Sequence, residues 1–151
     1  MELNKYNFVI VCSKDYNEKT EFVIDNIKNN YMDGKILFFS LEHEINGLIK
    51  NFMLDIGINN LKIIDTPITI EKIKEIINNY NPKIIYIDYL QLIGGATHIK
   101  NFSMQQQFIL HELYSYTTKF NTRIVVTYLM SAKTSNNDIL EELKNYKVLF
   151  I

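Results

Sequence analysis

An apolar run that ends in a single carboxylate constrains the possible folds of this chain most strongly. Residues 84–87 read Ile-Ile-Tyr-Ile, and Asp88 follows them, ahead of Tyr-Leu-Gln-Leu-Ile over 89–93. Such a run of β-branched and aromatic residues is typical of a parallel strand that is buried on both faces. Open α/β sheets bind their ligands at the carboxyl ends of these strands. Asp88 is therefore a candidate ligand-binding residue, and the alternative interpretation is a capping or turn carboxylate.

Strand-like and helix-like segments alternate along the chain. The strand-like runs cover 8–12, 36–40, 61–64, 83–87, 123–129 and 148–151. Helical spacing of apolar residues predicts helices over about 19–30, 45–56, 70–80, 104–120 and 137–145. Thr69 is the predicted N-cap of the third helix, and Ser103 with Gln106 has capping-box spacing for the fourth. This alternation predicts an α/β fold in one domain, 1–151, with a parallel β-sheet core and helices on both faces.

Composition narrows the classes of protein that fit this chain. A formal net charge of −1 disfavours a globally basic nucleic-acid binder. No apolar run reaches the roughly 18 residues of a membrane span, and the N-terminus lacks the pattern of a signal peptide. Cys12 is the only cysteine, so it cannot form an internal disulfide, and it is expected to be a small buried hydrophobic residue. These features predict a cytoplasmic protein in a reducing compartment that does not associate with membranes.

Several segments together resemble the C-terminal RecA-like ATPase domain of DnaB-type replicative DNA helicases. The most specific is 87–93, Ile-Asp-Tyr-Leu-Gln-Leu-Ile, which is similar to that family's Walker B strand. The other similarities follow the family's order over nearly the whole chain: 35–42 ending in Ser-Leu-Glu, 64–70 with Asp-Thr-Pro, Gln105-Gln106, 124–129, 138–140 and 148–151. The resemblance implies a RecA-like P-loop NTPase fold, with ATP and Mg²⁺ as the cofactors of an active member.

The resemblance also implies a P-loop after the first strand, where this chain has residues 13–20, Ser-Lys-Asp-Tyr-Asn-Glu-Lys-Thr. Lys19 and Thr20 align with the Lys and Thr of Gly-x-x-x-x-Gly-Lys-Ser/Thr, but the glycine positions carry Ser13 and Glu18. A Cβ obstructs the backbone geometry that glycine permits. A like-charge pair at about 4 Å costs roughly 4 kcal/mol at an intermediate dielectric, so Glu18 would oppose a polyphosphate. We expect weakened or lost phosphate binding; alternatively the segment is an ordinary solvated loop that keeps Lys19 and Thr20 as remnants.

Three further positions correspond to functional positions of the family. Glu42 aligns with the glutamate that polarises the attacking water, although the dipole of a helix would also favour a carboxylate in its first turn. Asp88 would hold Mg²⁺ through water. Tyr128 stands at the position of the sensor glutamine, whose paired donor and acceptor a tyrosine cannot reproduce, so its ring is expected to pack or to close the cleft.

Direct DNA contact is expected to be weak or absent. The segment that matches the family's DNA-contacting loop is 94–101, in which Lys100, with His98, is the candidate for phosphate contact. Binding scales with the number of phosphates neutralised, so one or two charges add little affinity, and a solvated loop is the alternative.

The family's arginine finger lies beyond its last strand, whereas this chain stops at Ile151. We therefore expect a degenerate helicase-like protein, deficient in ATP hydrolysis, that acts as a binding or regulatory factor in DNA replication. A replicative helicase, a primase or another replisome protein is the expected partner. One alternative is an ATP-binding, helicase-type ATPase with an atypical P-loop that needs a partner subunit. Another is a stable fragment of a longer gene without a role of its own.

Overall fold

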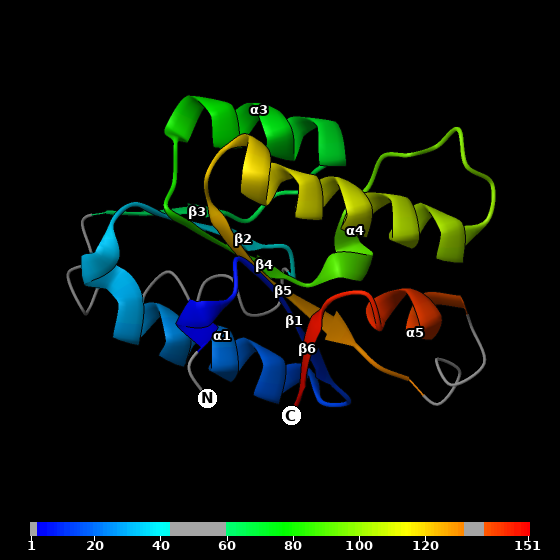
Figure 1. Ribbon diagram of the computed structural model, residues 1–151, viewed down its shortest axis with the longest axis horizontal. Helices are drawn as coiled ribbons and strands as arrows, with labels where there is room; N and C mark the ends of the chain where they lie inside the picture. The colour runs from blue at the N-terminus through cyan, green and yellow to red at the C-terminus, as the bar shows by residue number, and fades with distance from the viewer. Residues whose placement is uncertain (1–2, 43–59, 132–137) are drawn as a thin grey trace.

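The computed structural model describes residues 3–42, 60–131 and 138–151, and it contains one six-stranded sheet whose strands are all parallel (Figure 1). The strand order is β3-β2-β4-β5-β1-β6. The strands are β1 (Phe8–Ser13), β2 (Ile36–Ser40), β3 (Leu61–Ile64), β4 (Ile84–Asp88), β5 (Arg123–Leu129) and β6 (Lys147–Phe150). The α-helices are α1 (Tyr16–Asn30), α3 (Ile70–Tyr80), α4 (Phe102–Lys119) and α5 (Asp138–Leu143). Short 3-10 turns cover Leu3–Lys5, Tyr31–Asp33 and Leu90–Leu92.

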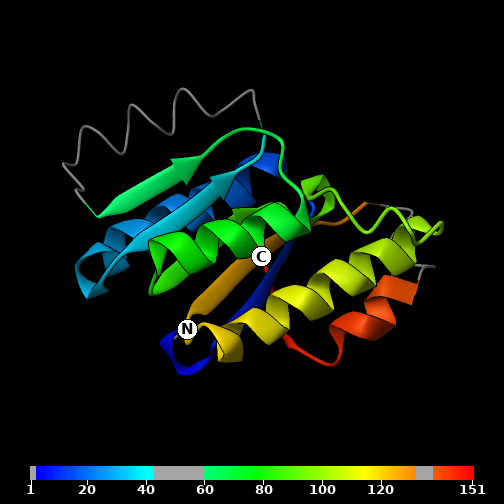
Figure 2. The same ribbon diagram turned by 90° about the horizontal axis from the view of Figure 1, so that it is seen from above.

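The predicted α/β fold with helices on both faces of a parallel sheet is confirmed. Figure 1 shows α1 on one face and α3 with α4 on the other, and Figure 2 shows α3 and α4 lying over the strands. Alternate residues of each strand face opposite sides, so each buried strand contributes to two apolar clusters. Val9 and Val11 of β1 pack in the cluster under α1, whereas Ile10 packs under the other helices. Within the described residues, no helix is long and apolar enough to cross a membrane.

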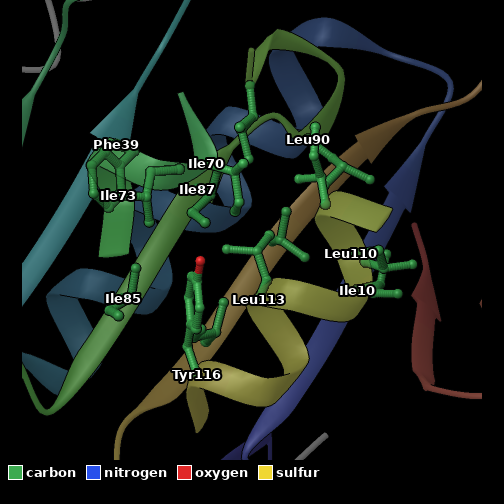
Figure 3. Close-up of a cluster of buried hydrophobic side chains, with 14 of the residues drawn as sticks. Ile10, Phe39, Ile70, Ile73, Ile85, Ile87, Leu90, Leu110, Leu113 and Tyr116 are labelled. Carbon is green, nitrogen blue, oxygen red and sulfur yellow. The ribbon is translucent and has the colours of Figure 1, made fainter. Parts of the chain in front are cut away.

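The larger cluster fills the space between the sheet and α3, α4 and α5 (Figure 3). It includes the inner face of α3, Ile70, Ile73 and Ile77, as the periodicity predicted. Thr69 caps α3 by accepting a hydrogen bond from the Lys72 amide at 3.2 Å. The helix ends at Asn81, in the left-handed region at φ 56°, immediately before Pro82. The predicted helix over 45–56 lies outside the described residues.

Two helix starts differ from the sequence-based expectation. The capping box predicted at Ser103 is wrong, because Asn101 is the N-cap of α4 and accepts from the Met104 amide at 3.1 Å. Asn is as effective an N-cap as Ser, so the helix can begin two residues earlier than expected. Helix α1 begins at Tyr16 rather than near Lys19, and Asp15 is its cap. The loop between β1 and α1 is therefore only two residues long, Lys14 and Asp15, and Lys19 lies inside the helix.

Candidate functional site

Four of the predicted site residues meet at the carboxyl edge of the sheet. Asp88 is the last residue of β4, and Glu42 follows β2, the neighbouring strand, by two residues. Lys19 and Thr20 reach the same place from α1, which starts just beyond the end of β1. Parallel strands all present their carboxyl ends at one edge, so strand ends far apart in sequence converge there. The sheet topology thus assembles the group that the sequence could only propose residue by residue.

Lys19 is the centre of this cluster. Its Nζ donates hydrogen bonds to Glu42 Oε2 and Asp88 Oδ1, each at 2.9 Å. The Lys19 and Asp88 side chains are fully buried, and the Glu42 side chain is 17% exposed. One ammonium therefore balances two carboxylates, and the charges of these three side chains leave a net of one negative charge. A buried cation of this kind is held by its partners, because removal from water is costly unless the charge is paired.

Two threonine hydroxyls complete the hydrogen bonding of Asp88. Thr20 Oγ1 donates to Asp88 Oδ2 at 2.7 Å, and Thr127 Oγ1 donates to Asp88 Oδ1 at 2.7 Å. Asp88 accordingly accepts from one ammonium and two hydroxyls. Thr127 lies on β5 and was not predicted as a site residue. The available signal was a polar residue inside the otherwise apolar run 124–129, on a strand adjacent to β4.

Two tyrosine rings cover the Lys19 ammonium. Lys19 Nζ lies 4.5 Å from the ring centroid of Tyr89 and 5.5 Å from that of Tyr16. The two rings meet edge to face, with centroids 6.1 Å apart and planes inclined at 76°. Burial, and then Tyr16 and the charges of the nearby carboxylates, raises the pKa of Tyr89 to about 12, so its hydroxyl stays protonated at neutral pH. Cation–π contact adds to the ion pairing and helps to keep Lys19 in place.

The backbone amides that a P-loop would turn towards phosphate are already bonded. Asp15 Oδ1 accepts from the amides of Asn17 at 2.7 Å and Glu18 at 3.0 Å. Ser13 closes the turn, because its Oγ accepts from the Asp15 amide and donates to the Asp15 carbonyl, both at 3.0 Å. Glu18, at the second glycine position, is an exposed residue of the first helical turn. A side-chain carboxylate and a turn of helix thus occupy the place of a phosphate cradle, and this arrangement does not fit a triphosphate.

The oxygen ligands that Mg²⁺ prefers are partly represented in the cluster. The Thr20 hydroxyl and the Asp88 carboxylate are of the type used in P-loop enzymes. The Lys19 ammonium, however, lies against Asp88 Oδ1 at hydrogen-bond distance. In the part of the chain that the structure describes, no group of three or more His, Cys, Asp or Glu residues is arranged to hold a metal ion.

Tyr128, at the predicted sensor position, lies away from this cluster. Its side chain packs in the larger apolar cluster with Ile10 and is 3% exposed, whereas Thr127 faces the opposite side of the sheet towards Asp88. An amide does sit at the end of β5, but it belongs to Gln91. Gln91 Nε2 donates to the Leu129 carbonyl at 2.7 Å, and the Leu129 amide donates to Gln91 Oε1 at 3.3 Å. This pairing ties the turn after β4 to the end of β5.

The predicted DNA-contact residues are separate from the carboxyl-edge cluster. Lys100 is exposed, and it is the only lysine or arginine in the segment 94–101. The ring of His98 packs edge-on against Phe108 of α4, with centroids 5.4 Å apart. The segment starts from a fixed point, because the Gly94 amide donates to the Ile68 carbonyl at 2.8 Å and its carbonyl accepts from Ile70 at 3.0 Å.

Comparison with solved structures identifies the fold. The chain is similar to a solved ATPase domain of a DnaB-like replicative helicase, with 20% identity and a TM-score of 0.65 over 87% of this chain and 60% of that one. It is also similar to a structure described as a DnaB-like replicative helicase and its interactions with primase, with 20% identity and a TM-score of 0.69 over 87% of this chain and 41% of that one.

These similarities confirm the predicted RecA-like fold, as it occurs in the ATPase domains of DnaB-like replicative helicases. The chain matches about 60% and 41% of the lengths of those two proteins. No family model matches the sequence. No curated protein matches it either.

Proposed function

We propose that this protein is a RecA-fold binding or regulatory factor of DNA replication that does not hydrolyse ATP efficiently. One observation carries the proposal: the first turn of α1, capped by Asp15, takes the place of a phosphate cradle. The fold of a helicase ATPase domain supports the link to replication. The bonded amides of the first turn support the loss of the catalytic step, because phosphate binding at a helix start depends on free N–H groups.

Entry of a triphosphate would require several coupled changes. Asp15 would have to release the Asn17 and Glu18 amides, and Lys19 would have to leave Asp88 and Glu42. Each carboxylate released in this way would face a polyanion. At about 4 Å a single like-charge pair costs roughly 4 kcal/mol at an intermediate dielectric. Nucleotide binding here would therefore be weak even where the chain can rearrange.

The proposed partner is a replisome protein, either a replicative helicase, a primase or another component. A solved structure with this fold is described by its interactions with primase, which makes this class a reasonable first choice. Binding through DNA alone is not proposed, because Lys100 supplies a single lysine charge in the segment 94–101. Affinity for nucleic acid rises with the number of phosphates neutralised.

Steady-state ATP hydrolysis, measured with and without single-stranded DNA, tests the proposal. We expect a rate at background level in both conditions. A clear rate that disappears in Glu42→Gln and in Lys19→Ala would contradict it. Glu42→Gln is the more informative variant, since Glu42 is partly exposed and its amide can still accept from Lys19. Lys72, an exposed residue paired with Glu75, provides the control variant Lys72→Gln.

A second candidate function is an ATP-binding, helicase-type ATPase that needs a partner subunit. The observation that favours it is the convergence of Lys19, Thr20, Glu42 and Asp88 within hydrogen-bonding contact. These residues correspond to the phosphate-binding, metal-binding and water-activating positions of the resemblance. A bound ligand stabilises a fold by mass action, so millimolar ATP with Mg²⁺ should raise the melting temperature. The absence of any shift would exclude this candidate.

A further inference from the structure

A second hollow lies at the amino edge of the sheet, opposite the Lys19 cluster. It has a volume of about 450 Å³. Its walls are the two turns that lead into β4 and β5, residues 81–83 and 120–123, together with Asn7, Lys35 and Thr117. Figure 2 shows α3 and α4 running side by side back to this edge, where β4 and β5 begin. The hollow is called the amino-edge pocket below.

The amino-edge pocket is strongly basic for a chain of this composition. Lys35, Lys83 and Arg123 line it, and none of its lining residues is acidic. The whole chain, in contrast, has 16 basic and 17 acidic residues. Helix carboxyl ends attract cations, and Lys35 Nζ does donate to the Tyr80 carbonyl at the end of α3, at 3.3 Å. Each helix end amounts to only about half a negative charge, so the ends of α3 and α4 leave most of the positive charge unbalanced.

Arg123 is the only arginine of the chain and its guanidinium is incompletely bonded. Nη1 and Nη2 each donate to Asn4, to the side-chain and the backbone oxygen respectively, both at 3.2 Å. Nε is buried and has no hydrogen-bond partner. A buried donor without a partner costs free energy, and the planar guanidinium suits carboxylate and phosphate oxygens. The unsatisfied Nε thus adds an unused donor to the wall of a cationic pocket.

Basic character continues along the rim of the amino-edge pocket. Lys119 belongs to the last turn of α4, and its Nζ lies 5.6 Å from the ring centroid of Phe120, a lining residue. Lys74 of α3 lies close enough that its hydrogen bonding and its charge lower the pKa of Lys119. The packing of α3 on α4 therefore brings two cations together. An anion bound nearby would relieve that repulsion.

We propose that the amino-edge pocket binds a small molecule that carries a chain of phosphate groups. Arg123, Lys83 and Lys35 contact the phosphates, and Pro82 and Phe120 form an apolar wall for an organic moiety. The volume lies in the range of small-molecule sites, which is about 300–1,000 Å³. The proposal is independent of the carboxyl-edge cluster, because the two places lie at opposite ends of the strands.

Titration with inorganic tripolyphosphate, followed by amide NMR of the full chain at low salt, tests this site directly. We expect saturable shifts in the amides of 81–83 and 120–123, except Pro82, which has none. Arg123→Gln and Lys83→Gln should each raise the dissociation constant about tenfold, the effect of losing a charge-assisted hydrogen bond. Lys72→Gln, which removes the same charge from an exposed site, should leave binding unchanged.

A parallel titration with a nucleoside triphosphate distinguishes the two sources of a phosphate chain. Tighter binding of the nucleoside form would assign the apolar wall to the base, and equal binding would assign the site to the phosphate chain alone. The proposal is overturned by the absence of shifts at millimolar tripolyphosphate, or by equal weakening in Lys72→Gln. Lys83→Gln covers the case in which Arg123→Gln loosens the contact with Asn4. Lys19→Met should not alter this binding, so failure here would leave the proposed function untouched.

Discussion

Replacing Lys19 with methionine is the perturbation that the structure predicts most sharply. Methionine keeps the length of the side chain and its apolar stem but removes the ammonium. The change leaves Asp88 fully buried with only the Thr20 and Thr127 hydroxyls as partners, and it leaves Glu42 without its ion pair. A lysine that merely awaits phosphate in a solvated loop would cause no such loss.

The expected destabilisation is large for a single substitution. Breaking a buried ion pair by removing one partner costs about 3–5 kcal/mol, because an uncompensated charge remains in the interior. For a domain of roughly 150 residues, each kcal/mol lowers the melting temperature by about 2–4 °C. We therefore expect Lys19→Met to lower the melting temperature by about 6–20 °C.

Urea unfolding of a double-mutant cycle measures the pairing itself. The four proteins are the unmodified chain, Lys19→Met, Asp88→Asn and the double variant. Because the double variant removes both charges, its loss of stability should fall short of the sum of the single losses by about 0.5–3 kcal/mol. Additive losses, or a loss below about 1 kcal/mol in Lys19→Met, would refute a buried ion pair at this position.

Three further predictions follow from other parts of the fold. Asp15→Ala should lower the free energy of unfolding by about 0.5–2 kcal/mol through loss of the α1 cap, while Asp25→Ala, on the exposed face of the same helix, changes it by less than about 0.5 kcal/mol. Ile73→Ala, which empties a fully buried position under α3, should cost about 2–5 kcal/mol in urea unfolding, and a smaller loss would show that the helix is not packed there. Stability should fall as pH rises from about 9 through about 12, because burial raises the pKa of Cys12 from 9.0 and of Tyr89 from 10.0, each to about 12, so the unfolded chain releases these protons first. Urea midpoints measured across that range test the trend, which Cys12→Ala should weaken at its lower end; a flat profile in the unmodified chain would contradict it.

Elements with a strong pattern could be predicted from the sequence. The inner face of α3 follows helical periodicity, and the buried strands read as apolar runs, so tertiary packing agrees with local preference. The start of α1 was missed because a P-loop alignment implies a long loop before Lys19. Asp15 followed by Glu18 three residues later was a local signal of a helix start, and the structure confirms Asp15 as the cap.

Contacts between distant segments could not be predicted in the same way. Lys19 and Asp88 were proposed individually, but their direct pairing depends on how α1 crosses the end of β4. The rings of Tyr16 and Tyr89 come from different segments and meet only over the folded cluster. The amino-edge pocket likewise combines residues that are far apart in the chain, so no linear motif announces it.

Amide-resolved NMR of the unmodified chain, titrated with ATP and Mg²⁺, tests most directly whether the first turn of α1 has replaced the phosphate cradle. The account predicts that the amides of residues 14–20 and of Asp88 do not shift at millimolar nucleotide. Any shifts at 81–83 and 120–123 report the amino-edge pocket instead and leave this conclusion unchanged. Saturable shifts at 14–20 in the micromolar range, lost in Lys19→Met while the variant remains folded, would contradict it.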